Sequence, residues 1–189
     1  HELGPIARLL KINRGNRMVS LVSVASGAWG LKEYIKEHKP EDEELLNTEF
    51  AQGDIVTTVI TCANGETITM TLDTTLPRYY SRGFYVQGTK GMFMEDNGSL
   101  YLEGEEHARD HFDWKKHWGN VEGYREKYEH PMWKKYLKSI RNKTEVPIDV
   151  YDMAAWMCIT PLSEQSIAMG GHPVAIPDFT NGAWMHRVY

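Results

Sequence analysis

The residues with the clearest capacity for chemistry lie in one short segment, residues 77–82, which reads Pro-Arg-Tyr-Tyr-Ser-Arg. It holds two arginines, Arg78 and Arg82, and two tyrosines, Tyr79 and Tyr80. Guanidinium groups offer fixed forks of N–H donors to hydroxyls, carboxylates or phosphates, and a phenol can give or take a proton. In the alternative interpretation the segment is an edge loop whose tyrosines only pack. Residue types alone favour neither interpretation.

A second candidate is His1, which precedes Gly4, Pro5 and a helical pattern. Imidazole titrates near neutral pH, and functional histidines often lie on loops beside regular elements. A histidine at this position is also what a purification tag leaves behind. The chain begins with His1 rather than Met and runs directly into a pattern typical of folded structure. We therefore expect it to be one half of a larger enzyme.

Three further histidines, His107, His111 and His117, lie among acidic residues. Histidines at positions i and i+4 of a helix can share a zinc ion with a carboxylate. Lysines and tryptophans surround these residues, and the sequence shows no second cluster of ligands. We therefore expect an exposed segment and no metal site.

Composition narrows the class of protein. The 189 residues are 41% hydrophobic, which is enough for the core of about one domain. The formal net charge is -5 and no basic run exceeds two residues, so a nucleic-acid partner is not expected. No apolar run is long enough to span a bilayer. The sequence also contains neither a G-x-G-x-x-G motif nor a P-loop, so we expect no nucleotide site of the usual kind.

The elements that must position these side chains begin with hairpins. Residues 54–75 alternate with a period of two around Asn64-Gly65, which predicts a pair of antiparallel strands. A second pair flanks Asn97-Gly98, a strand is expected within residues 83–88, and another spans residues 17–25. These neighbouring strands predict an antiparallel sheet.

Helical patterns lie before, between and after the strands. They cover residues 4–10, a polar excursion at 29–49 broken at Pro40, residues 121–141, and residues 149–169. Asp149 suits the N-cap of the last helix, Gly170-Gly171 its end, and Pro161 should kink or split it. The sequence therefore predicts a single α+β domain over residues 1–189, with an open-faced antiparallel sheet and helices on one face.

Seven motifs, read together in this order, resemble the C-terminal domain of the Gfo/Idh/MocA oxidoreductases. More narrowly, they resemble the branch of the NAD-dependent alpha-N-acetylgalactosaminidases, glycoside hydrolase family 109. The motifs are His-Glu-Leu-Gly-Pro at 1–5, Arg-Gly-Asn-Arg at 14–17, Pro-Arg-Tyr-Tyr-Ser-Arg at 77–82, Gly-Thr-Lys-Gly at 88–91, Tyr-Glu-His-Pro at 128–131, Asp-Val-Tyr-Asp-Met-Ala-Ala-Trp at 149–156 and Ile-Pro-Asp-Phe at 176–179.

The resemblance implies a partner, a cofactor and a reaction. An N-terminal Rossmann domain would hold NAD or NADP, so no cofactor is expected in this chain, and the sheet would wall a substrate cleft and join copies into a homo-oligomer. In that branch NAD takes a hydride from the sugar C3, the acidified C2 proton leaves, the aglycone is eliminated, water adds and the hydride returns. By motif, His1 and Tyr80 match catalytic positions, and Arg78, Tyr79 and Arg82 become candidates for binding the sugar or glycoside.

One departure from the family pattern concerns the stretch between Lys138 and Asp149. Relatives carry a glycine-rich segment and a further helix there, whereas Lys138 runs directly into Ser139. Either the protein lacks this segment or the sequence omits it. Two rival functions also stay open: a simple sugar dehydrogenase, and a non-catalytic module for oligomerisation or carbohydrate binding. Because some relatives have twin-arginine export signals, both the bacterial periplasm and the cytoplasm are expected locations.

Overall fold

The computed structural model describes residues 1–104 and 131–188. The chain forms two compact units. Unit 1 contains His1, Leu3–Arg78 and Ile148–Tyr189, and unit 2 contains Glu2 and Tyr79–Pro147. The chain thus leaves unit 1 immediately after Arg78 and returns to it at Ile148.

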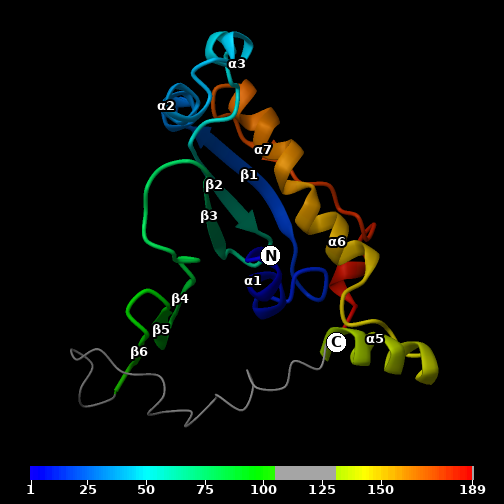
Figure 1. Cartoon of the computed structure of the whole chain (residues 1–189). Helices are drawn as coiled ribbons and strands as arrows, with labels where there is room; N and C mark the ends of the chain where they lie inside the picture. Colours follow the sequence, from blue (N-terminus) through cyan, green and yellow to red (C-terminus); the bar gives the residue numbers. More distant parts are fainter. Residues whose placement is uncertain (105–130, 189) are drawn as a thin grey trace. The chain divides into compact units, whose positions relative to one another are not determined.

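Unit 1 is built on a four-stranded antiparallel sheet of order β3-β2-β1-β7 (Figure 1). Its strands are β1 (Met18–Ala25), β2 (Ile55–Cys62), β3 (Thr67–Asp73) and the short β7 (Val174–Ala175). The predicted hairpin of residues 54–75 and the strand at 17–25 are confirmed. Strand β7 lay outside the prediction, because two residues carry no alternating pattern.

The turn between β2 and β3 contains four residues, Ala63, Asn64, Gly65 and Glu66. The Cys62 amide donates to the Glu66 carbonyl at 2.9 Å and closes the loop. Gly65 has φ +96°, a conformation that glycine adopts without steric cost. The Asn64 side chain donates to the Gly15 carbonyl at 3.1 Å, so the turn is tied to the loop that precedes β1.

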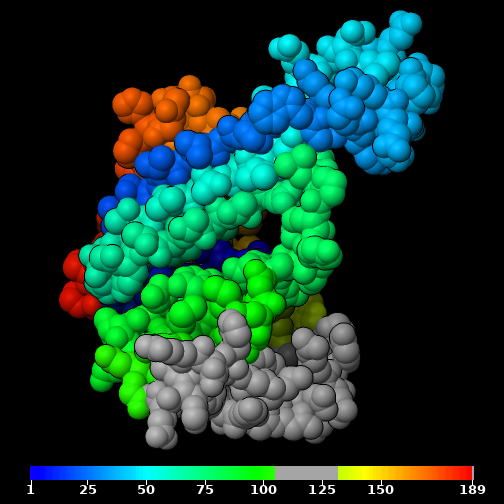
Figure 2. All heavy atoms as spheres, turned by 90° about the vertical axis from the view of Figure 1, so that its left-hand side faces the viewer, coloured from blue at the N-terminus to red at the C-terminus, as the bar shows by residue number. Residues whose placement is uncertain are grey.

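The two faces of this sheet differ in composition. The face that packs on helix α7 carries the buried residues of each strand, among them Leu21 and Ile60. We call the other face the open face, and no helix of unit 1 crosses it in Figure 2. Cross-strand register places eleven residues of β1, β2 and β3 on the open face, of which only Asp73, at the end of β3, is charged: Ser20, Val22, Val24, Ile55, Thr57, Val59, Thr61, Thr67, Thr69, Thr71 and Asp73. This confirms the α+β class with an open-faced antiparallel sheet.

Helices of unit 1 begin and end close to their predicted positions. The first is α1 (Leu3–Leu9), and the polar excursion forms α2 (Trp29–His38) and α3 (Glu43–Asn47). In Figure 2, residues 29–50, in blue and cyan, project beyond the end of the strands. A 3₁₀ turn, Ala183–Met185, follows β7.

The predicted helix at 149–169 is split in two, as Pro161 requires. Its parts are α6 (Val150–Met157) and α7 (Ile159–Ala168), which run alongside β1 (Figure 1). Pro161 lies in the first turn of α7, where its missing N–H has no intrahelical partner to lose. Asp149 caps α6 through a capping box with Asp152, and Gly171 donates to the Ser166 carbonyl at 2.8 Å where α7 ends.

A layer of buried hydroxyls lies between α7 and the sheet, inside an otherwise apolar core. The Ser23 and Thr58 hydroxyls lie 2.7 Å apart, and Ser163 lies 3.3 Å from Thr58. Ser166 accepts from the Ser23 amide at 2.9 Å and donates to the His172 carbonyl at 2.8 Å. Apolar residues surround this layer: Leu3, Ala7, Ile12, Met18, Leu21, Ile60, Cys62, Ile68, Ala155, Ile159, Val174 and Ile176.

Unit 2 has a separate three-stranded antiparallel sheet of order β4-β5-β6. Its strands are β4 (Tyr85–Gly88), β5 (Gly91–Met94) and β6 (Ser99–Leu102), which confirms the hairpin at Asn97-Gly98. The strand signals therefore divide between two sheets instead of extending one, because β3 and β4 are separated by the loop at residues 74–84.

Helix α5 (Pro131–Asn142) completes the described part of unit 2. It coincides with the end of the predicted helix at 121–141, whose residues 121–130 lie outside the described residues. His107, His111 and His117 also lie outside them. Within residues 1–104 and 131–188, no three metal-ligating side chains gather in one place. None of the helices that the structure describes has the length and apolar character needed to cross a bilayer.

Candidate active site

The candidate loop begins where β3 ends. The Arg78 guanidinium pairs with the Asp73 carboxylate, with Nε and Oδ2 3.2 Å apart. Asp73 is the last residue of β3, so this ion pair fixes the loop against the end of a regular element. The contact with Asp73 thus positions Arg78. A role of Arg78 in binding substrate would have to leave the contact between its Nε and Asp73 in place.

The two tyrosines of the loop are strongly exposed, Tyr79 to 97% and Tyr80 to 85%. Within the part of the chain that the structure describes, neither ring is packed into a core, and the role of the two tyrosines stays a prediction. Arg82 Nε donates to the Tyr80 phenol oxygen at 3.3 Å. This contact with Tyr80 raises the pKa of the Arg82 guanidinium above its ordinary value. The structure therefore brings Tyr80 and Arg82 together in unit 2.

Ser81 anchors the loop between these two residues. Its hydroxyl donates to the Asp96 carboxylate in the turn between β5 and β6, and it accepts from the Gly83 amide at 2.7 Å. Gly83 has φ +60°, which glycine tolerates. Because the Ser81 hydroxyl bonds to both Asp96 and Gly83, it restrains the backbone between Tyr80 and Arg82.

His1 lies in unit 1, immediately before α1, and its side chain is exposed. Its backbone carbonyl accepts from the Gly4 amide at 3.3 Å, which ties it to the first turn of the helix. His1 belongs to one unit and Tyr80 to the other.

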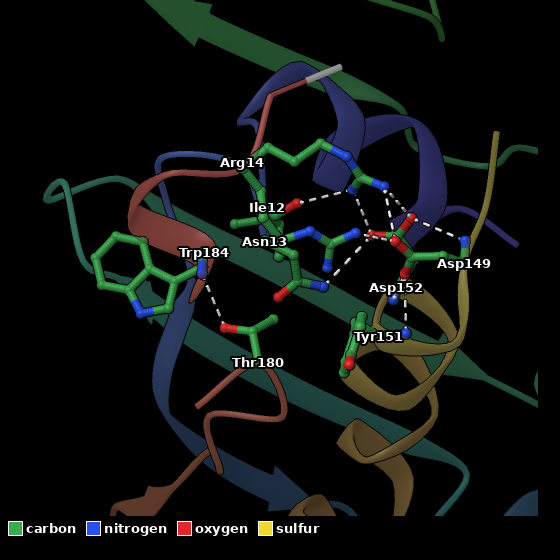
Figure 3. A network of polar contacts seen from close by, with 9 residues as sticks. Ile12, Asn13, Arg14, Asp149, Tyr151, Asp152, Thr180 and Trp184 are labelled. Carbon is green, nitrogen blue, oxygen red and sulfur yellow. Dashed lines mark hydrogen bonds and ion pairs between the residues drawn. The ribbon is translucent and has the colours of Figure 1, made fainter. Parts of the chain in front are cut away.

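A buried ionic network in unit 1 was missed by the sequence analysis except for the cap at Asp149 (Figure 3). Arg14 binds Asp152 through both terminal nitrogens, at 2.7 and 2.9 Å, and Asp149 at 3.2 Å. The side chain of Arg14 is 4% exposed and that of Asp152 is 6% exposed. Asn13 donates to Asp152 at 3.4 Å, from a backbone with φ +64°. The network therefore locks the loop before β1 to the start of α6.

Arg187 joins this network from the C-terminal side. It pairs with Asp149, and its guanidinium carbon lies 4.9 Å from the centre of the Tyr151 ring. Burial raises the pKa of the Asp149 carboxyl, but the Asp152 amide and the Arg187 guanidinium outweigh it and hold that pKa below its ordinary value. These residues are enclosed within unit 1, so we interpret the network as structural.

The lowered pKa of Asp149 predicts acid sensitivity. A carboxyl whose pKa is lower in the folded than in the unfolded protein stabilises the fold above the unfolded value, and loses this contribution as the pH falls through the folded value. We expect the free energy of unfolding to decrease as the pH is lowered below about 4. Urea unfolding between pH 7 and 2 measures this. Asp149→Asn should flatten the dependence, and an unchanged pH profile in that variant would contradict the assignment.

A second buried carboxylate, Asp54, occupies the N-terminus of α2. It accepts from the Gly30 amide at 2.8 Å and the Leu31 amide at 3.3 Å. The turn from β1 into α2 is the described position most like a phosphate-binding strand-to-helix turn. Because a carboxylate already satisfies these amides, they cannot cradle a pyrophosphate. This turn therefore does not fit the pyrophosphate of a dinucleotide.

An α+β domain with an open antiparallel sheet is the class to which the C-terminal domains of Gfo/Idh/MocA proteins belong. Within that class, the chain belongs to the family described as "Glycosyl hydrolase 109, C-terminal domain", which matches residues 1–141 and 136–186. The resemblance inferred from the seven motifs is thereby confirmed.

Individual relatives agree with this assignment. An "Alpha-N-acetylgalactosaminidase" of Tannerella forsythia is 40% identical over 207 positions, which cover 99% of this chain and 43% of the relative. A "Glycosyl hydrolase family 109 protein" of Parabacteroides distasonis is 41% identical with the same coverage. One of Stenotrophomonas maltophilia is 40% identical, covering 99% of this chain and 44% of that protein. The chain thus spans less than half the length of these relatives.

The comparisons also bear on the discontinuity at Lys138. The two matched segments of the family overlap at residues 136–141, within α5. The alignment with the first relative runs over 207 positions, although the chain has 189 residues. That relative therefore contains residues without a counterpart here, and the overlap indicates α5 as their position.

Proposed function

We propose that this chain is the substrate-binding C-terminal half of an NAD-dependent glycosidase that acts on an α-N-acetylgalactosaminide. The observation that carries the proposal is membership of the glycosyl hydrolase 109 family, together with a 40% identical relative named for that activity. In this proposal an N-terminal Rossmann domain is the partner that binds NAD, because the chain covers only 43% of the relative and its turn into α2 does not fit a pyrophosphate. NAD would supply the reversible oxidation of the sugar.

The residues of this chain would handle protons and orient the sugar. Tyr80 is exposed and has the Arg82 guanidinium 3.3 Å from its oxygen, so a phenolate that forms there is next to a cation. Such a pair suits a group that takes a proton from a sugar carbon and later returns it. His1 is the proposed second proton-transfer group. Arg78 and Tyr79 are proposed to bind the sugar hydroxyls or the acetamido group.

The experiment that tests this function uses the full-length protein, NAD and an aryl α-N-acetylgalactosaminide. We expect release of the aglycone that requires NAD and leaves no net NADH. Formation of stable NADH from free sugar, without aglycone release from the glycoside, would instead identify a sugar dehydrogenase. Neither reaction, in a protein that binds the sugar, would identify a non-catalytic carbohydrate-binding module.

We further propose that the open face joins copies of the protein into a homo-oligomer. Its centre carries no charge, and its one charged residue, Asp73, lies at the end of β3 and pairs with Arg78. Solvent-facing sheet surfaces usually carry polar and charged side chains, whereas the centres of interfaces are depleted of charge. Val59 lies at the centre of this array, between Val22 and Thr69, and is 42% exposed.

A charge at the centre of the open face should therefore disrupt the oligomer. We expect Val59→Arg to lower the molar mass of the full-length protein in light scattering to that of the monomer, because the arginine would be buried without a partner. Leu9→Arg is the matched control, since Leu9 is 56% exposed on α1, away from this sheet face. An unchanged mass for Val59→Arg would exclude the open face as the interface.

A further inference from the structure

Asp54 is tied to more than the helix that it caps. Its side chain is almost fully buried, with 1% of the residue exposed. Besides the Gly30 and Leu31 amides, its carboxylate accepts from the Thr75 hydroxyl at 2.5 Å. The same residue thus contacts the start of α2 and the beginning of the candidate loop.

The backbone of Asp54 strengthens this link. Its carbonyl accepts from the Thr74 amide at 3.0 Å and from the Thr74 hydroxyl at 3.2 Å. Its own amide donates to the Gly27 carbonyl at 3.1 Å. Residues 74 and 75 are therefore fixed to Asp54 by both main chain and side chain.

The first turn of α2 packs directly against the same segment. A Cβ on Gly30 would lie 2.8 Å from Leu76 Cδ2 and 3.0 Å from the Thr75 hydroxyl oxygen. A Cβ at this position would displace the Leu76 side chain and press on the Thr75 hydroxyl, so glycine allows the close packing of α2 on residues 75 and 76. Together with the Asp73–Arg78 ion pair, these contacts fix the chain at five positions between residues 73 and 78.

We propose that Asp54 is a positioning residue for the candidate loop: it joins the N-terminus of α2 to Thr75 and so fixes the segment of unit 1 from which the chain continues into Tyr79 and Tyr80. The inference rests on the proposed function, because it assigns Asp54 the task of holding a loop that acts on substrate. Displacement of a reacting group by about 1 Å can lower a rate by as much as a hundredfold. The proposed proton transfer therefore needs the start of the candidate loop to be held in place.

Thr75→Val in the full-length protein tests the clamp selectively, because valine has nearly the shape of threonine and leaves the bonds from Asp54 to α2 intact. We expect amide hydrogen exchange of residues 76–82 to become about tenfold faster, and kcat with the aryl glycoside to fall about tenfold while KM changes less than threefold. Thr75→Ser restores the hydroxyl and should return both quantities to within about twofold of the original protein.

Asp42→Ala is the control. Asp42 caps α3 by accepting from the Leu45 amide at 2.9 Å, and alanine removes that cap at a helix other than α2. If the role of Asp54 is purely structural, Thr75→Val and the Asp42 variant will lose the same thermal stability. In that case Thr75→Val will not lower kcat more than the Asp42 variant does. Unchanged exchange or unchanged kcat in Thr75→Val would overturn the proposal. If the original protein releases no aglycone, the proposed function fails, while the exchange data still decide whether Asp54 holds the loop.

Discussion

Tyr80→Phe is expected to lower kcat for aglycone release by about 10²- to 10⁴-fold in the full-length protein, the usual contribution of a general acid or base. The substitution removes one oxygen from a ring that is 85% exposed, so folding should be unaffected. It also removes the acceptor for Arg82 Nε, which lies on the surface and can be solvated by water. The measurement is steady-state kinetics at saturating NAD.

Tyr85→Phe is the control for loss of a phenol oxygen. Tyr85 is on β4, where its hydroxyl donates to the Gln87 side chain at 2.5 Å, outside the candidate loop. Its turnover should stay close to that of the original protein. If kcat of Tyr80→Phe stays within threefold of the original value, Tyr80 is not a general acid or base in the reaction.

Asp152→Ala should produce the largest loss of stability among single substitutions in unit 1. It leaves the Arg14 guanidinium, which is 4% exposed, without its main counterion. It also removes one half of the capping box of α6 and the acceptor for Asn13. Breaking a buried ion pair from one side costs about 3–5 kcal/mol, because the remaining charge stays desolvated.

Urea unfolding of the protein and its variant at pH 7 measures this cost. Glu33→Ala is the matched comparison, since Glu33 pairs with Lys36 at 2.6 Å where the side chains are 72% and 62% exposed. An exposed pair of this kind contributes about 0–1 kcal/mol. If both variants lose the same small amount, Arg14 is solvated and the network does not hold unit 1 together.

Local signals predicted local structure well. Asn64-Gly65 marked a hairpin, Asp149 capped a helix, and Pro161 divided one, because each of these effects acts within a few residues. The residues of unit 1 that join distant segments were not predictable in this way. Asp54 bonds to Thr75 and to α2, and Arg14 bonds to Asp152. These residues are far apart in the sequence, and a periodic pattern does not indicate which distant residues come into contact.

The candidate site at residues 77–82 stays a prediction from residue types. Residue types at 77–82 suggested chemistry but left packing and function equally open, and the structure adds that Tyr79 and Tyr80 are exposed within this chain. Asp54 had one usable signal. In the hairpin register, Ile55 pairs with Asp73, so the preceding residue must lie opposite Thr74, at the start of the loop. This register, which could be predicted from the hairpin, places the Asp54 carboxylate beside the start of the candidate loop.

The sequence separation within the ionic network has a consequence for synthesis on the ribosome. Arg14 and Asp152 are 138 residues apart in the chain. At synthesis rates of roughly 5–20 residues per second, about 7–28 s pass between the synthesis of Arg14 and that of its counterion. Unit 2 is translated during this interval, because it lies between the two parts of unit 1. The nascent loop before β1 therefore carries an uncompensated cation while unit 2 is made, and unit 1 can close only after residues 149–152 have left the exit tunnel.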